Sequence, residues 1–115
     1  MLLLEKEGPW DMSERYRHIM VFGCGGWGTA IARLLARKGL QVSLWAANPE
    51  EAEEILARRE NVRYLPGIPW EPAIALTSDL EVARTADLGV VVVPTAFLRD
   101  FIARAAPLLP SRLPL

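Results

Sequence analysis

The 115-residue sequence has few of the residues from which metal and disulfide sites are built. Cys24 is the only cysteine and His18 the only histidine, so an internal disulfide and a zinc site made of cysteines are excluded. The 13 basic and 14 acidic side chains give a formal net charge of -1, which provides no basic surface for nucleic acid or an anionic membrane. We therefore expect no metal, no nucleic acid and no polyanionic partner.

Long apolar runs are also missing. The opening MLLLEKEGPW has only three leucines before its first charges, too short and too acidic for a signal peptide, and no later run reaches the length of a membrane span. These absences favour a cytoplasmic protein. Residues 1–17 lack sustained periodicity and are predicted to be an extension ahead of the fold, with Met12 a candidate for the natural start.

Short apolar segments alternate with amphipathic ones over residues 18–115. Strands are predicted at residues 19–23, 41–47, 73–78 and 88–94, and helices follow them, one ending at Gly39 and the others at residues 48–60, 79–86 and 95–109. Asn48 and either Ser78 or Asp79 are the expected N-caps of the second and third helices. Continuous Val, Ile and Leu runs separated by helices predict an α/β domain whose parallel sheet of about four strands is covered on both faces.

Four glycines lie between the first strand and the first helix. Gly23, Gly25 and Gly28 form the pattern G-x-G-x-x-G in the strand–turn–helix context that makes this pattern informative. Gly23 permits a tight turn, Gly25 lets the backbone approach a pyrophosphate, and Gly28 allows the helix to pack closely on the strand. The motif predicts a dinucleotide-binding, Rossmann-like doubly wound fold. The alternative is a plain glycine turn in another doubly wound fold.

Further motifs add a family resemblance. GCGGWGTAIA, VSLWAANPE, NVRYLPGIP and TSDLEVARTADLGVVVVPTAFLRDFI follow one another in the order of the N-terminal domain of the bacterial type of NAD(P)-dependent glycerol-3-phosphate dehydrogenase, which this chain resembles over about residues 18–110. The resemblance implies NAD or NADP as the coenzyme and the interconversion of dihydroxyacetone phosphate and glycerol 3-phosphate. That reaction supplies the glycerol backbone of phospholipids.

The resemblance also implies coenzyme-contacting residues outside the three glycines. Gly26 and Trp27 match a small residue and an aromatic beside the cofactor, and Tyr64 begins the loop of residues 64–67 near the cofactor crevice. Pro94 ends the fourth strand at its carboxyl edge, where open α/β sheets bind ligands, and Phe97 follows on the next helix. The alternatives are that Trp27 packs on a neighbour, that residues 64–67 form a simple turn, and that Phe97 belongs to the core.

Two positions leave the choice between NAD and NADP open. The second strand is followed by neither the acid that binds a ribose 2′-hydroxyl nor the arginine that favours a 2′-phosphate. Ala47 stands where relatives often carry Arg or His, and Asn48 is the nearby polar side chain available for the adenosine ribose. Cys24 replaces the family's usual alanine, and we expect it to be a small buried residue and not a reactive thiol.

No catalytic residue is assigned within these 115 residues. The family uses lysines that would lie beyond Leu115. Lys6 falls in the extension, and Lys38 ends the first helix at the edge of the sheet opposite the ligand crevice. His18 is likewise expected at the edge opposite the ligand crevice. Asp79, Asp87 and Asp100 are interpreted as a cap, a loop residue and a helix-surface charge.

We therefore expect a dinucleotide-binding portion of a dehydrogenase that is inactive by itself. The alternative is a non-catalytic nucleotide-binding or regulatory module that completes its sheet with a partner chain. The outer edge of the strand at residues 88–94 is expected to be unpaired, which would promote self-association into a homo-oligomer.

Overall fold

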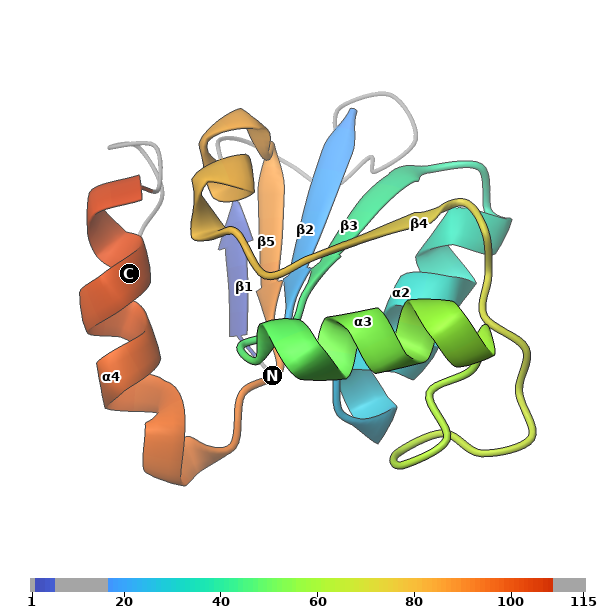
Figure 1. Ribbon diagram of the computed structural model, residues 1–115. Helices are drawn as coiled ribbons and strands as arrows, with labels where there is room; N and C mark the ends of the chain where they lie inside the picture. Colours follow the sequence, from blue (N-terminus) through green and yellow to red (C-terminus); the bar gives the residue numbers. More distant parts are fainter. Residues whose placement is uncertain (1, 6–16, 109–115) are drawn as a thin grey trace.

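Five strands form one mixed sheet in the computed structural model, which describes residues 2–5 and 17–108 (Figure 1). The sheet order is β1-β5-β2-β3-β4. The strands are β1 (Leu2–Glu5), β2 (His18–Phe22), β3 (Gln41–Trp45), β4 (Ile74–Thr77) and β5 (Leu88–Val91). The four from β2 to β5 are mutually parallel, as predicted, in the order typical of a doubly wound fold.

The helices alternate with the strands along the chain, as the sequence pattern predicted. They are α2 (Gly26–Arg37), α3 (Pro49–Arg58) and α4 (Thr95–Ala105), with 3₁₀ helices η1 (Leu80–Thr85) and η2 (Ala106–Leu108). Asn48 accepts a hydrogen bond from the Glu50 amide at the start of α3, and Asp79 caps η1 in the same way. The segment predicted as one helix from residue 95 is α-helical only to residue 105. Pro107 has no amide with which to continue the helical hydrogen bonds.

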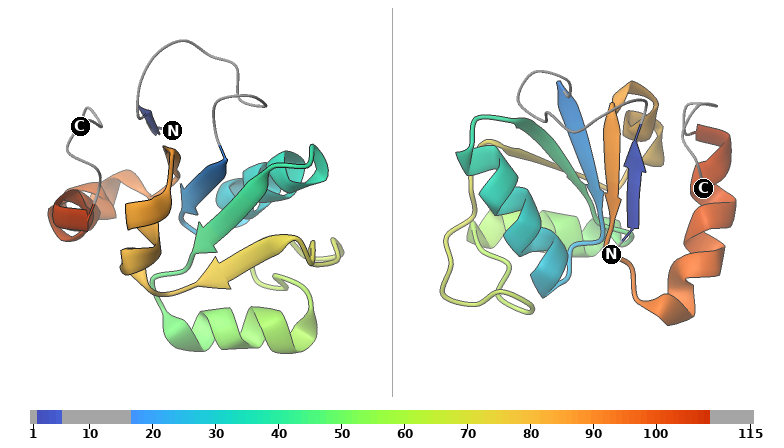
Figure 2. Two further views of the ribbon diagram at one scale, coloured as in Figure 1. Left: turned by 90° about the horizontal axis from the view of Figure 1, so that it is seen from above. Right: turned by 180° about the vertical axis from the view of Figure 1, so that it is seen from behind.

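Both faces of the sheet are buried, and β2 shows this most clearly. Ile19 and Val21 pack in one apolar cluster with residues of α2 and α3, whereas Met20 and Phe22 pack in a second cluster with residues of η1 and α4. Figure 2 shows α2 and α4 on opposite sides of the strands. Because successive side chains of a strand point to opposite faces, a continuous apolar run such as residues 19–22 fits a strand covered on both sides.

The outer edge of β5 is paired, contrary to expectation. β1 lies antiparallel to it, with Leu2 opposite Val91 and Glu5 opposite Leu88. Part of the segment predicted to lie ahead of the fold therefore belongs to the sheet. An edge strand exposes a row of unsatisfied amide and carbonyl groups, and an antiparallel strand from elsewhere in the chain satisfies them as well as a parallel one would. The final segment, residues 109–115, lies outside the described residues.

Within the part of the chain that the structure describes, no helix is long and apolar enough to cross a membrane.

Candidate functional site

The turn between β2 and α2 is held by contacts that only glycine permits. Gly23 has φ 119° and an added Cβ there would lie 2.6 Å from the carbonyl oxygen of Val92, which follows β5. A Cβ on Gly28 would lie 1.7 Å from the carbonyl oxygen of Gly23. The first helical turn thus sits directly on the strand end, as the spacing of the motif predicted.

Gly25 differs from both, because a Cβ built on it meets nothing within 4 Å. Its φ of -66° suits any residue, so the backbone conformation does not demand glycine. Gly25 is also the N-cap of α2, and no side chain caps that helix. The turn therefore leaves open space beside a helix N-terminus that has no side-chain cap among the described residues, which is the arrangement that binds phosphate.

Three large aromatic side chains are exposed around this end of the sheet. Trp27 on the first turn of α2 is 77% exposed, Phe97 on the first turn of α4 is 62% exposed, and Tyr64 is 45% exposed. Among the residues that the structure describes, Phe97 is therefore not part of the core and Trp27 is not packed on a neighbour. Pro94 is also exposed and is the N-cap of α4. The starts of α2, α3 and α4 all lie toward the lower end of the sheet in Figure 1.

The chain after β3 offers little polar chemistry. Ala46 is buried, and Ala47 and Asn48 are exposed. The Oδ1 atom of Asn48 accepts the Glu50 amide at 2.9 Å, so this atom serves the start of α3. Ala47 and Asn48 stay predicted site residues, and the side-chain oxygen of Asn48 already has a partner in the protein.

Asn61 is a polar residue at this site that the sequence analysis did not single out. It is 2% exposed. Its Nδ2 atom donates to the Cys24 carbonyl at 2.7 Å and to Thr29 Oγ1 at 3.0 Å, and its Oδ1 atom accepts the Tyr64 amide at 3.4 Å. Asn61 begins the NVRYLPGIP motif, but nothing in the sequence indicates which turn its amide contacts. The available signal was an amide residue at the start of this motif, three residues before Tyr64.

Cys24 is buried, as expected, and its thiol donates to Glu51 Oε1 at 3.0 Å. Burial, and to a lesser extent this hydrogen bond to a carboxylate, raises the pKa of Cys24 to about 12. The thiol stays protonated at neutral pH and is not a nucleophile. Its position beside the helix N-terminus does not overcome the cost of burying a thiolate.

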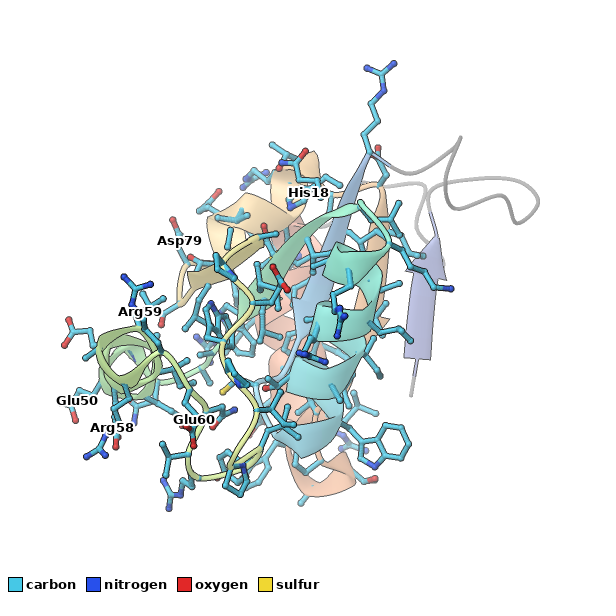
Figure 3. All side chains as sticks on the ribbon, turned by 90° about the vertical axis from the view of Figure 1, so that its right-hand side faces the viewer. His18, Glu50, Arg58, Arg59, Glu60 and Asp79 are labelled. Atoms are coloured by element: carbon cyan, nitrogen blue, oxygen red, sulfur yellow. The ribbon has the colours of Figure 1, made fainter. Side chains whose placement is uncertain are left out.

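His18 lies at the other end of the sheet, as predicted. It is 6% exposed, with Nε2 2.7 Å from Ser43 Oγ and Nδ1 3.1 Å from Thr85 Oγ1. Asp87 accepts the backbone amides of Arg17 and His18, and it ties the start of β5 to that of β2. Figure 3 shows His18 well separated from Glu50 and Glu60 beside α3. These contacts are structural, and Asp100 is an exposed charge on α4, as expected.

A hollow of about 220 Å³ lies along α3. Its lining includes four carboxylates and two arginines: Glu50, Glu51, Glu54, Glu60, Arg58 and Arg63. Arg58 pairs with Glu54 at 3.2 Å. The carboxylates give this hollow an acidic lining, so it suits an anionic diphosphate less well than the glycine turn does. Among the described residues, no three or more His, Cys, Asp or Glu side chains are placed so that together they could hold a metal ion.

The sequence of this chain is similar to those of known proteins. The family model described as the N-terminus of NAD-dependent glycerol-3-phosphate dehydrogenase matches residues 18–115. Glycerol-3-phosphate dehydrogenase [NAD(P)+] of Geobacter sulfurreducens is 50% identical over 99 residues, covering 85% of this chain and 29% of that protein. The corresponding protein of Rhodospirillum rubrum is 43% identical over 105 residues, covering 90% of this chain and 30% of that protein.

A solved structure agrees with the sequence relatives. Glycerol-3-phosphate dehydrogenase of Coxiella burnetii superposes with a TM-score of 0.74 at 34% identity, covering 84% of this chain and 30% of that one. The chain thus spans about 30% of the length of the relatives that it matches. The strand order and the glycine turn agree with these matches. The chain therefore belongs to the NAD-dependent glycerol-3-phosphate dehydrogenase family and corresponds to the N-terminal region of its members.

Proposed function

We propose that this chain binds NAD or NADP, with the coenzyme diphosphate seated against Gly25 at the N-terminus of α2. The observation that carries the proposal is the contrast among the glycines. Gly23 and Gly28 are required by backbone contacts at 2.6 Å and 1.7 Å, whereas the space beside Gly25 is open. A glycine with no steric requirement from its own fold suits the close approach of a ligand.

The remaining candidates come from several elements. Gly26 and Trp27 lie on the first turn of α2, Ala47 and Asn48 follow β3, Tyr64 lies in the segment after α3, and Pro94 and Phe97 are the N-cap and a first-turn residue of α4. Their exposed aromatic rings would cover the coenzyme and exclude water from it. When bound, the nicotinamide ring accepts or delivers the hydride of the reaction. Ala47 brings no charge to the ribose, which leaves both coenzymes as candidates.

We infer that the complete protein is a cytoplasmic enzyme. Its reaction would be the interconversion of dihydroxyacetone phosphate and glycerol 3-phosphate, which serves phospholipid synthesis, and it would act as a homo-oligomer. Family membership and the described fold support the assignment of the reaction. Within residues 1–115 the lysines are Lys6 and Lys38. Lys38 follows α2, which runs back toward the amino ends of the strands, so it lies away from the turn at Gly25. We therefore expect this chain alone to bind coenzyme without catalysing turnover.

Calorimetric titration of the purified 115-residue chain with NAD⁺ and, separately, NADP⁺ tests the proposal. Saturable binding of at least one is expected, with no loss of NADH or NADPH absorbance on adding dihydroxyacetone phosphate. If neither coenzyme binds, the proposal is wrong. Turnover by a preparation free of host enzyme would overturn the assignment of binding without catalysis.

The second candidate function is a nucleotide-binding or regulatory module without catalysis, completed by a partner chain. The pairing of β1 with β5 disfavours a partner strand at that edge. Coenzyme binding by a longer natural protein that shows no dehydrogenase activity would favour this alternative.

A further inference from the structure

The Cys24–Gly25 peptide is anchored from its buried side. The Cys24 carbonyl oxygen accepts from Asn61 Nδ2 at 2.7 Å and from Thr29 Oγ1 at 3.2 Å. Asn61 and Thr29 also contact each other, with Nδ2 3.0 Å from Oγ1. All three residues are buried, so water does not compete for these hydrogen bonds.

This anchoring fixes the direction of the Gly25 amide. A trans peptide is planar, and its N–H points opposite to its C=O. The described residues contain no cis peptide. Because the Cys24 carbonyl points toward Asn61 and Thr29, the N–H of Gly25 points away from that buried pair. A Cβ built on Gly25 would meet nothing within 4 Å. The space beside this residue is therefore open, and an anion can approach without displacing protein atoms.

Asn61 also holds the loop that packs on the next glycine. Its Oδ1 accepts the Tyr64 amide and its carbonyl oxygen accepts the Leu65 amide at 2.8 Å. The Tyr64 carbonyl in turn lies so close to Gly26 that an added Cβ would be 2.9 Å from it. One buried side chain therefore joins the glycine turn to the loop that carries Tyr64.

We propose that Asn61 is a positioning residue for coenzyme binding, which acts by orienting the Cys24–Gly25 peptide so that the Gly25 amide donates to the coenzyme diphosphate. This inference rests on the proposed function and extends it to a residue that does not itself touch the ligand. Thr29 shares the role, since its hydroxyl bonds both the Asn61 amide and the Cys24 carbonyl. Preorganising a donor in this way removes the cost of ordering it when the ligand binds.

Asn61→Leu is the direct test, because leucine has a similar branched shape and no hydrogen-bonding atoms. The dissociation constants of NAD⁺ and of ADP-ribose, which carries the diphosphate without nicotinamide, are measured by calorimetry. We expect both to rise roughly tenfold, the scale of one hydrogen bond to a charged group. Nuclear magnetic resonance follows the Gly25 amide, whose chemical shift should move in the variant before any ligand is added.

Three further variants separate positioning from general stability. Ser43→Ala removes the buried hydrogen bond to His18 at the other end of the sheet, and we expect its loss of stability to leave both dissociation constants within about twofold of the parent. Thr29→Val should weaken binding in the same direction as Asn61→Leu, and Thr29→Ser, which keeps the hydroxyl, should restore it. The Thr29 pair also decides the question if Asn61→Leu does not fold.

Each result has a defined consequence. Unchanged affinity in Asn61→Leu and Thr29→Val, or an equal loss in Ser43→Ala, means that Asn61 only stabilises the fold and overturns the inference. If the parent chain binds both ligands while these variants bind equally well, the proposed function stands and the inference fails. If the parent binds neither ligand, both fail.

Discussion

At the amino ends of the strands, the ring nitrogens of His18 each face a hydroxyl, and Asp87 accepts two backbone amides. At the carboxyl ends, α2 begins without a side-chain cap, and Trp27 and Phe97 extend into solvent. One end satisfies these polar groups with partners inside the protein. The other leaves donors and apolar rings open, which costs stability unless a ligand uses them.

The carbonyl of Cys24 lies at one end of the sheet but is hydrogen-bonded like the polar groups at the other. It sits at the carboxyl end, yet it is bonded as completely as the groups around His18. Because hydrogen bonds within the protein hold the buried side of the turn, the other side can stay open and still be rigid. The comparison therefore predicts that substitutions at the two ends, and on the two sides of the turn, will separate stability from ligand binding.

The largest effect is expected from Gly28→Ala. The added Cβ would lie 1.7 Å from the Gly23 carbonyl oxygen, a backbone atom that cannot move without shifting β2 or α2. We expect a loss of about 3 kcal/mol or more in the free energy of unfolding, measured by urea denaturation. An unchanged unfolding midpoint would contradict the close packing of this helix on the strand.

Gly25→Val should instead abolish dinucleotide binding and leave the fold intact. The position has φ -66° and open space around it, so valine fits the protein and occupies the place proposed for the diphosphate. Calorimetric titration with NAD⁺ measures binding by the variant and the parent, and circular dichroism melting curves compare their folds. Parent-like affinity would show that Gly25 is not where the diphosphate binds.

His18→Leu tests the opposite end. The change leaves Ser43 Oγ without its 2.7 Å partner, and we expect the variant to lose about 1–3 kcal/mol of stability. Coenzyme affinity should not change, since His18 lies at the opposite end of the sheet from the turn. A large fall in affinity with little loss of stability would place His18 in the function instead.

A smaller effect is expected from breaking the pairing of β1. Leu3 lies opposite Val90, and Leu3→Pro removes a backbone donor from the segment that covers β5. Part of the β5 edge would become available to a second copy, so we expect concentration-dependent self-association by light scattering. Leu3→Thr, which keeps the backbone amide, serves as the control. A monodisperse Leu3→Pro protein would show that this edge does not drive association.

The smallest effect concerns Cys24 and pH. Its pKa is raised from 9.0 to about 12 in the fold, so the thiol is neutral there while the thiol of the unfolded chain ionises above pH 9. The contribution of the neutral Cys24 thiol to folding stability is complete below pH 9 and decreases as the pH rises from 9 toward 12. Cys24→Ala should lose less stability over that interval. Iodoacetamide should label Cys24 slowly in the folded chain at pH 8 and rapidly in urea; rapid labelling of the folded chain would contradict its burial.

The periodicity of the sequence was enough to predict the four parallel strands and the helices between them. Residues 19–22 form one continuous apolar run, and only a strand covered on both faces buries all of it. Asn48 and Asp79 cap the elements that they were expected to cap, because capping depends on the amides of the next few residues. Gly23 and Gly28 were also identifiable from spacing, since both constraints arise within a strand–turn–helix unit.

Tertiary structure alone decided the features that join distant segments. The pairing of β1 with β5 links residues 2–5 to residues 88–91, and a short leucine segment carries no information about which edge it will join. Asn61 lies 37 positions from Cys24 in the sequence, yet it orients the peptide that precedes Gly25. Local propensities act over a few residues, and the direction of a buried amide is set by whatever acceptor the folded chain places beside it.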